Sequence, residues 1–167
     1  MPTIIENKKA RWHYDILETW EAGLVLTGQE VKSLKSGQGD IKSAYISIRP
    51  LARAGKKGPR FQAALLNAFI PPYAKAGPLP GYEPRRARAL LLKRREMVSL
   101  LGRLQMAGLT LVPIRLYTLN RRIKLMVGLA RGKTAVDKRD TIRRRETERE
   151  MRRSLLRSVG KKRLINL

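Results

Sequence analysis

The sequence predicts a mainly β fold, in which a small antiparallel barrel with one or two packed helices is followed by a basic C-terminal tail. Segments with strand patterns outnumber segments with helical patterns. The expected elements do not alternate as β–α–β units, which argues against a doubly wound parallel sheet. From residue 131 onward the chain is rich in charge and poor in apolar side chains. We therefore expect a barrel domain over residues 1–130 and a tail over residues 131–167.

Five segments have the patterns of β-strands, either alternating apolar and polar residues or a short apolar run that stops at glycine or proline. They span residues 22–28, 43–49, 61–70, 109–117 and 123–130. A further, weaker strand is expected between the third of these segments and the second helix. Because proline has no backbone N–H, Pro113 predicts an edge strand or a β-bulge in the fourth segment.

Two segments have the pattern of helices that pack on a core. The first, residues 29–37, places Val31 and Leu34 on one side and ends at Gly37. The second spans residues 93–108, and Gly108 suits the position after its end. Its apolar stripe consists of Met97, Leu100, Leu101 and Leu104. These side chains are expected to be core contacts.

The tail has the charge pattern of a helix but lacks a buried face. No helix breaker occurs from Asp137 to Val159, and several opposite charges lie four residues apart, a spacing that supports a helix. No apolar residue lies between Ile142 and Met151, so a continuous apolar stripe is missing. A helix without packing is marginal at this length. The tail is therefore expected to be disordered or helical, and to fold when phosphates neutralise it.

The charge of the chain points to a polyanionic partner. Lys and Arg number 37 against 13 Asp and Glu, a formal net charge of +24. Self-repulsion on this scale favours nucleic acid as the partner over a merely soluble basic surface. The chain has no apolar run of the ~20 residues that span a bilayer, and its tail lacks the wide apolar face of a membrane-surface helix. No secretory signal is recognised, so no membrane partner and a cytoplasmic location are expected.

The residues of an enzyme are scarce in this chain. The absence of cysteine excludes thiolate zinc sites and thiol nucleophiles, and His13 is the only histidine. No phosphate-loop, dinucleotide-binding or metalloprotease motif occurs. Glu18 and Glu21 form a close carboxylate pair in the domain. We therefore expect no enzyme, metal site or cofactor; a basic ribonuclease using His13 or Glu21 is kept as an alternative.

Some rings and acids suit contacts with RNA. Basic residues surround the rings of the segment Trp12-His13-Tyr14, as stacking on unpaired bases requires, and these residues are Lys8, Lys9 and Arg11. Glu21 and Glu30 each lie beside a predicted strand end, where a carboxylate either accepts hydrogen bonds from RNA or forms a salt bridge. Tyr117 is expected to pack in the core.

Motifs along nearly the whole chain occur in the order of one known family. They are NKKAR (7–11), Tyr14, EAGLVLTGQEVKSLKSG (21–37), YISI (45–48), RARALLLKRREM (86–97), GLTLVPIRLY (108–117), GLARGK (128–133) and DKR (137–139). Together they resemble the SsrA-binding protein family, also called small protein B.

This resemblance implies an OB-type barrel that binds the tRNA-like part of transfer-messenger RNA (SsrA RNA). In the family, the protein accompanies this RNA to the A site of a ribosome stalled on an mRNA without a stop codon. The tail enters the empty mRNA channel at the decoding centre, becomes helical and so senses the channel. The implied function is a monomeric, non-enzymatic adaptor of trans-translation; an OB-type ribosomal or ribosome-assembly protein is the alternative.

The resemblance also implies which residues act. Glu21, Leu91 and Lys93 match the cluster that meets transfer-messenger RNA, and Arg94 adds a cation beside it. Motif positions on or near the same face are Asn7, Lys8, Arg11, Tyr14, Lys32, Tyr45 and Asn67. Basic positions near the end of the last strand are Lys124, Arg131 and Lys133. The tail hinge and the ribosome-binding segment comprise Gly132, Asp137, Lys138, Arg139, Arg143, Arg144 and Arg145.

Overall fold

The structure of the protein is a computed structural model. It describes residues 2–51, 60–77, 80–134, 146–147 and 150–151. The chain divides into two compact units, Met1–Gly132 and Lys133–Leu167. In the second unit, residues 146–147 and 150–151 are helical. The predicted ribosome-binding residues of the tail beyond Lys133 lie outside the described residues, namely Asp137, Lys138, Arg139, Arg143, Arg144 and Arg145.

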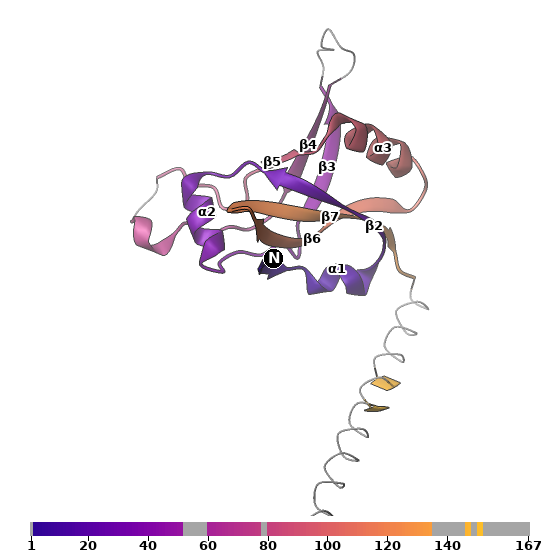
Figure 1. Cartoon of the computed structure of the whole chain (residues 1–167), viewed down its shortest axis with the longest axis horizontal. Helices are drawn as coiled ribbons and strands as arrows, with labels where there is room; N and C mark the ends of the chain where they lie inside the picture. Colours follow the sequence, from indigo (N-terminus) through magenta and orange to yellow (C-terminus); the bar gives the residue numbers. More distant parts are fainter. Residues whose placement is uncertain (1, 52–59, 78–79, 135–145, 148–149, 152–167) are drawn as a thin grey trace, which may run out of the picture. The chain divides into compact units, whose positions relative to one another are not determined.

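The described residues form one seven-stranded antiparallel sheet in the order β1-β6-β7-β2-β5-β4-β3 (Figure 1). The strands are β1 (Thr3–Glu6), β2 (Tyr14–Leu24), β3 (Tyr45–Pro50), β4 (Phe61–Leu66), β5 (Arg88–Leu91), β6 (Leu109–Leu119) and β7 (Arg122–Gly132). The last strand of this order, β3, also packs against β6, so the sheet curls on itself. The predicted mainly β, OB-type antiparallel barrel is confirmed.

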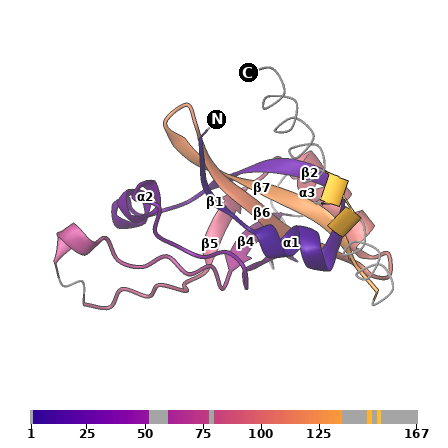
Figure 2. The ribbon, with the colours of Figure 1, turned by 90° about the horizontal axis from the view of Figure 1, so that it is seen from below.

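In the first unit, the described residues form the α-helices α1 (Lys8–His13), α2 (Gly28–Lys35) and α3 (Arg94–Leu104), together with a short 3-10 helix at Ala74–Ala76. Figures 1 and 2 show α2 and α3 at opposite ends of the barrel. The predicted end of the second helix is wrong, because α3 ends at Leu104 and Gly108, with φ 79°, lies in the following turn. Helix α1 was not predicted, since it has six residues and buries only Ala10.

Strand β2 begins earlier than the sequence predicts. It pairs with β7 from Tyr14 opposite Gly132 to Gly23 opposite Lys124. The exposed side chains at 17–19 interrupt the apolar alternation, and a bulge lies nearby, so the pattern revealed only the buried end of this strand. Residues 25–27 lie outside the strand, contrary to the predicted segment 22–28.

Strand β6 is an interior strand despite its proline. It pairs with both β1 and β7, and its register with β7 shifts between Pro113 and Arg115. Pro113 was predicted to lie either at a β-bulge or in an edge strand. The β-bulge is confirmed, and the edge strand is wrong. The bulge absorbs the missing N–H without ending the ladder.

The barrel core is filled by the faces that the sequence pattern marks as apolar. Leu34 of α2 and Leu100 of α3 are fully buried, and so are Leu65, Leu116 and Leu125 from the sheet. Gly128 allows the close packing of β7 on its neighbours, because a Cβ there would lie 2.7 Å from Cδ1 of Ile114. The core thus joins both helices to the sheet.

Glu30 is buried and fixes α2 to the strand β5. It is fully inaccessible to solvent, as is Arg88, whose Nε donates to Glu30 Oε1 over 2.8 Å. Arg86 binds both carboxylate oxygens, and the backbone N–H of Thr27 donates to Oε2 over 2.8 Å. The remaining donors of Arg88 reach the carbonyls of Ala68 and Pro84. Of the two predicted roles of Glu30, the structure shows the salt bridge and excludes a surface facing RNA.

Candidate nucleic-acid interface

One face of the barrel carries a carboxylate that is bound by side chains from two nearby strands. Glu21 lies on β2, Lys124 on β7 and Tyr117 on β6. Lys124 Nζ lies 3.2 Å from Glu21 Oε1, and the hydroxyl of Tyr117 donates to Oε2. The side chains of Glu21 and Lys124 remain 40% and 26% exposed, so the pair is open to a partner. We call these three residues the Glu21 cluster.

The cluster has a fixed protonation state at neutral pH. The hydrogen bond from Tyr117 and the contact with Lys124 lower the pKa of Glu21 below its usual value. Burial, with the hydrogen bond to Glu21 adding to it, raises the pKa of Tyr117 to about 12. Glu21 is therefore an anionic acceptor and Tyr117 a protonated donor. The prediction that Tyr117 packs in the core is confirmed, since it is 2% exposed, but its link to Glu21 was missed.

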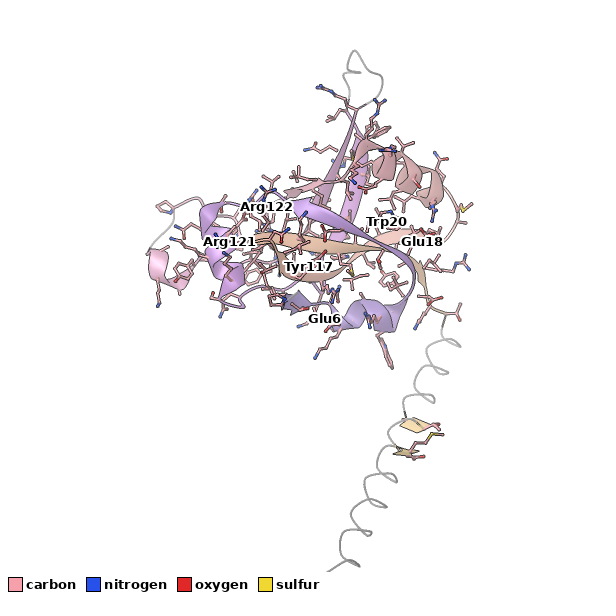
Figure 3. The ribbon with its side chains drawn as sticks, in the orientation of Figure 1. Glu6, Glu18, Trp20, Tyr117, Arg121 and Arg122 are labelled. Carbon is pink, nitrogen blue, oxygen red and sulfur yellow. The ribbon has the colours of Figure 1, made fainter. Side chains whose placement is uncertain are left out.

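The second predicted carboxylate, Glu18, has a different partner. It forms an ion pair with Arg103 of α3, whose guanidinium carbon lies 5.9 Å from the centre of the Trp20 ring. Figure 3 shows Glu18 and Trp20 toward α3, away from Tyr117. The close pair in the sequence is therefore not a pair of carboxylates sharing one site.

An apolar groove of about 340 Å³ adjoins the Glu21 cluster, and Lys124 belongs to both. Its apolar lining comes from β2, the segment between β2 and α2, α2, β5 and β7, and consists of Leu24, Leu26, Val31, Leu91 and Ile123. Its cationic wall consists of Arg121 in the turn between β6 and β7, and of Arg122 and Lys124 on β7. Leu91, on β5, lines the groove and is 63% exposed, a high exposure for a large apolar side chain. We call this feature the apolar groove.

Gly23 allows Leu91 to stand at the rim of this groove. The two residues are paired across β2 and β5, and a Cβ on Gly23 would lie 3.1 Å from Cβ of Leu91. A side chain at position 23 would therefore displace Leu91. The sequence identified Leu91 and Lys124, but missed Gly23 and the arginines of the turn.

A second pocket, of about 280 Å³, lies where β3 approaches β6 beside α1. It brings together five of the residues predicted to bind RNA, namely Asn7, Lys9, His13, Tyr14 and Tyr45. Lys42 adds a cation that the sequence analysis did not single out. Tyr45 is 54% exposed and so presents its ring to solvent. We call this feature the seam pocket.

Asn7 connects the segments around the seam pocket by hydrogen bonds. Its Nδ2 donates to the carbonyls of Ile41 and Pro113 over 3.2 and 3.0 Å, and its Oδ1 accepts from the backbone N–H of Ala10. Because both amide hydrogens are used inside the protein and the residue is 4% exposed, Asn7 is a positioning residue. The sequence pattern gave no means to distinguish this role from contact with RNA.

The remaining predicted residues line neither pocket. Lys32 lies over the ring of Tyr73, with Nζ 6.0 Å from its centre. Asn67, at φ 57°, donates to the carbonyl of Ser43 and accepts from Arg85. The other exposed or half-buried predicted residues are Lys8, Arg11 and Trp12 on α1, Lys93 and Arg94 at the start of α3, Arg131 and Gly132 at the end of β7, and Lys133 directly after it in the chain.

The described residues contain no group of three or more His, Asp or Glu side chains that could bind a metal ion. No helix within the described ranges has the length and apolarity needed to cross a membrane.

Comparison with known proteins places this arrangement in a family. The SmpB protein family matches residues 4–157. The SsrA-binding protein of Gloeothece citriformis is 43% identical over 154 residues, which are 92% of this chain and 93% of the relative. That of Roseiflexus sp. is 43% identical over 152 residues, 91% of this chain and 90% of the relative.

A solved structure supports the same assignment. A chain of the structure described as "tmRNA-SmpB: a journey to the center of the bacterial ribosome" superposes with a TM-score of 0.63 and is 39% identical. The match covers 86% of this chain and 96% of that chain. The chain therefore belongs to the SmpB protein family.

Proposed function

We propose that this protein is the RNA-binding adaptor of trans-translation, which binds the tRNA-like part of transfer-messenger RNA and delivers it to the A site of stalled ribosomes. Family membership and the names of its relatives support this function. The observation that carries it is the Glu21 cluster beside the apolar groove. It combines an oriented carboxylate, an exposed leucine and three cations on one face.

Each part of this face suits a different group of RNA. Lys124, Arg121 and Arg122 attract phosphates, which gives affinity that falls with salt. The Glu21 carboxylate repels phosphates but accepts hydrogen bonds from 2′-hydroxyls and base amino groups. Leu91 offers an apolar surface to a base. Together these groups favour folded RNA with accessible base edges over an unstructured polyanion.

The seam pocket and the tail are proposed to act on the ribosome and on further parts of the RNA. Tyr14, Tyr45 and His13 offer rings on which bases can stack, and Lys9 and Lys42 offer charge. From the sequence, the tail beyond the hinge at Gly132 would enter the empty mRNA channel and detect that mRNA is missing there. The charge pattern of the tail and the resemblance support this role.

We propose further that the protein is a monomeric adaptor that acts in the cytoplasm without a catalytic activity or cofactor. In the described part of the chain the two neighbouring carboxylates bind different cations, and His13 lines the seam pocket. A ribonuclease would need these groups to converge on one phosphate.

Deleting residues 131–167 tests the proposed function. Tagging of nascent chains on ribosomes stalled on an mRNA without a stop codon is expected to be abolished, whereas affinity for a tRNA-like transcript is expected to fall only modestly. Tagging and affinity are measured with the full chain as control. Tagging that survives the deletion would contradict the role of the tail. Stable incorporation of the protein into one ribosomal subunit, without transfer-messenger RNA, would contradict the adaptor role.

A further inference from the structure

The segment that leads into β3 forms part of the wall of the seam pocket. Lys42, Ser43, Ala44 and Tyr45 line the pocket, and the ring of Tyr45 is 54% exposed. Strand β3 begins at Tyr45, and residues 41–44 belong to no helix or strand. The conformation of this segment therefore depends on individual hydrogen bonds rather than on a strand ladder.

Side chains on either side of the segment bind its first half. The Nδ2 of Asn7 donates to the carbonyl of Ile41 over 3.2 Å, and the backbone N–H of Lys42 donates to Oδ1 of Asp40 over 2.7 Å. The backbone of Asp40 is in turn paired with that of Phe69, in both directions. The start of the segment is thus tied to α1 and to the segment after β4.

Asn67, directly after β4, binds the second half. Its Nδ2 donates to the carbonyl of Ser43 over 3.1 Å, and its Oδ1 accepts from Nη1 of Arg85 over 3.0 Å. The guanidinium carbon of Arg85 lies 5.3 Å from the centre of the Phe69 ring, which holds the arginine in place. Because the donor and the acceptor of the amide both have partners in the protein, Asn67 links Arg85 to the pocket wall.

A second asparagine shows that backbone conformation alone does not explain this amide. Asn67 and Asn120 both have positive φ, 57° and 48°, a conformation that asparagine and glycine tolerate best. Among the described residues, the side chain of Asn120 has no hydrogen-bond partner. Glycine would satisfy the backbone at either position, but at position 67 it would lose both hydrogen bonds.

We infer that Asn67 is a positioning residue for RNA recognition in the seam pocket. Arg85 orients the amide of Asn67, the amide fixes Ser43, and Ser43 lies two residues before Tyr45. A ring that is fixed before RNA binds loses less conformational entropy when a base stacks on it. This inference rests on the stacking role in the proposed function and deepens it, because Asn67, which lines neither pocket, acts on the base through Tyr45.

Hydrogen exchange tests the positioning without RNA. Asn67→Gly keeps the left-handed backbone and removes both hydrogen bonds of the amide. In the full-length protein, the backbone amide of Ala44 is expected to exchange about three- to tenfold faster in this variant, the range for loss of one hydrogen bond. NMR measures the exchange, and the melting temperature shows that the barrel remains folded.

A second variant and a matched control sharpen this test. Asn67→Asp keeps an acceptor for Arg85 but cannot donate to the carbonyl of Ser43, so it is expected to accelerate exchange at Ala44 as glycine does. Asn120→Gly makes the same substitution at the other left-handed asparagine, in the turn between β6 and β7. It is expected to leave exchange at Ala44 unchanged.

A double-mutant cycle connects Asn67 to the ring of Tyr45. The probe is a single-stranded octamer of oligouridine at physiological salt. Asn67→Gly is expected to weaken its binding about three- to fivefold, within the range for one hydrogen bond. In protein that already carries Tyr45→Ala, the same change should cost less than about twofold, because no ring remains to be positioned. Asn120→Gly is expected to bind the octamer like wild type.

The results separate the inference from the proposed function. Unchanged exchange at Ala44 in Asn67→Gly, or additive affinity losses in the cycle, would overturn the positioning role. Equal binding of the octamer by wild type and Tyr45→Ala would instead contradict the stacking role assigned to the seam pocket in the proposed function.

Discussion

Glu21 and Glu30 are both carboxylates bound by two side-chain partners, yet one lies on the surface of the barrel and the other inside it. Glu30 has no solvent exposure and is bound by Arg86, Arg88 and the backbone of Thr27. Glu21 is 40% exposed and is bound by Tyr117 and Lys124. The capacity of the buried carboxylate is used by the fold, whereas the exposed one keeps a side open to solvent.

The difference lies in what surrounds each acid rather than in the acid itself. Both glutamates follow or precede an apolar run in a basic sequence. Burial acts to raise the pKa of Glu30, but the hydrogen bonds from Arg86 and Thr27, with the charge of Arg88, outweigh it and hold the pKa below its usual value. The same charge state thus supports folding at Glu30, and it supplies the anionic acceptor that the proposed function assigns to Glu21.

Glu30→Gln is expected to give the largest effect on stability. It leaves Arg88 buried without its counter-charge, and breaking a buried pair in this way costs about 3–5 kcal/mol of unfolding free energy. Urea denaturation monitored by circular dichroism measures the loss. Glu21→Gln is the control and is expected to unfold at nearly the same urea concentration as wild type. Equal destabilisation by the two changes would contradict the distinction between a buried structural carboxylate and an exposed one.

The cost of Glu30→Gln is expected to depend on pH. Because folding lowers the pKa of Glu30, its stabilising effect is complete above the unfolded value of about 4.3 and is lost as the pH falls through the folded value. The gap in unfolding free energy between wild type and variant should therefore be full at pH 7 and shrink below about pH 4. A gap that is constant or widens on acidification would contradict this assignment.

When RNA affinity is measured instead of stability, Glu21→Gln is expected to have a larger effect than Glu30→Gln. Loss of the anionic acceptor should weaken binding of a tRNA-like transcript by about tenfold, the range for a hydrogen bond to a charged group. Gel shifts at one salt concentration measure the change. A variant that folds and binds like wild type would remove Glu21 from the interface.

Tyr117→Phe is expected to have a smaller effect in the same direction. It removes one of the two groups that orient Glu21, and should weaken RNA binding by about two- to fivefold, within the range for one hydrogen bond. In protein that already carries Glu21→Gln, the same change should have no further effect on affinity. Additive losses would assign Tyr117 to packing alone.

The strands with clear alternation could be predicted from sequence, but half of the first long strand could not. β4, β6 and β7 alternate or run apolar, and their positions were expected within a few residues. In β2, the exposed side chains at 17–19 interrupt the alternation of apolar and polar residues. Helix α1 is too short to show a helical repeat of apolar residues. Hydrophobic periodicity arises because one face of an element is buried. An element that buries little surface therefore shows little periodicity in its sequence.

Single residues of the candidate site could be proposed from the sequence, but its shape could not. The resemblance implies RNA-binding roles for Glu21, Leu91 and Lys124, which stay predictions; the structure places Leu91 and Lys124 in one groove and binds Glu21 to Lys124. The groove, however, draws its lining from β2, the segment before α2, α2, β5, the β6–β7 turn and β7, and only the folded barrel brings these segments together. The internal role of Asn7 and the hydroxyl contact of Tyr117 likewise depend on partners far away in the chain.

The account depends most on selective recognition of folded RNA by the barrel. The direct test is competition of full-length protein for a labelled tRNA-like transcript, with an unrelated hairpin and heparin as competitors at low and at physiological salt. We expect the unlabelled tRNA-like transcript to compete far better than either, and its advantage to grow at the higher salt. Equal competition by all three polyanions would contradict the account.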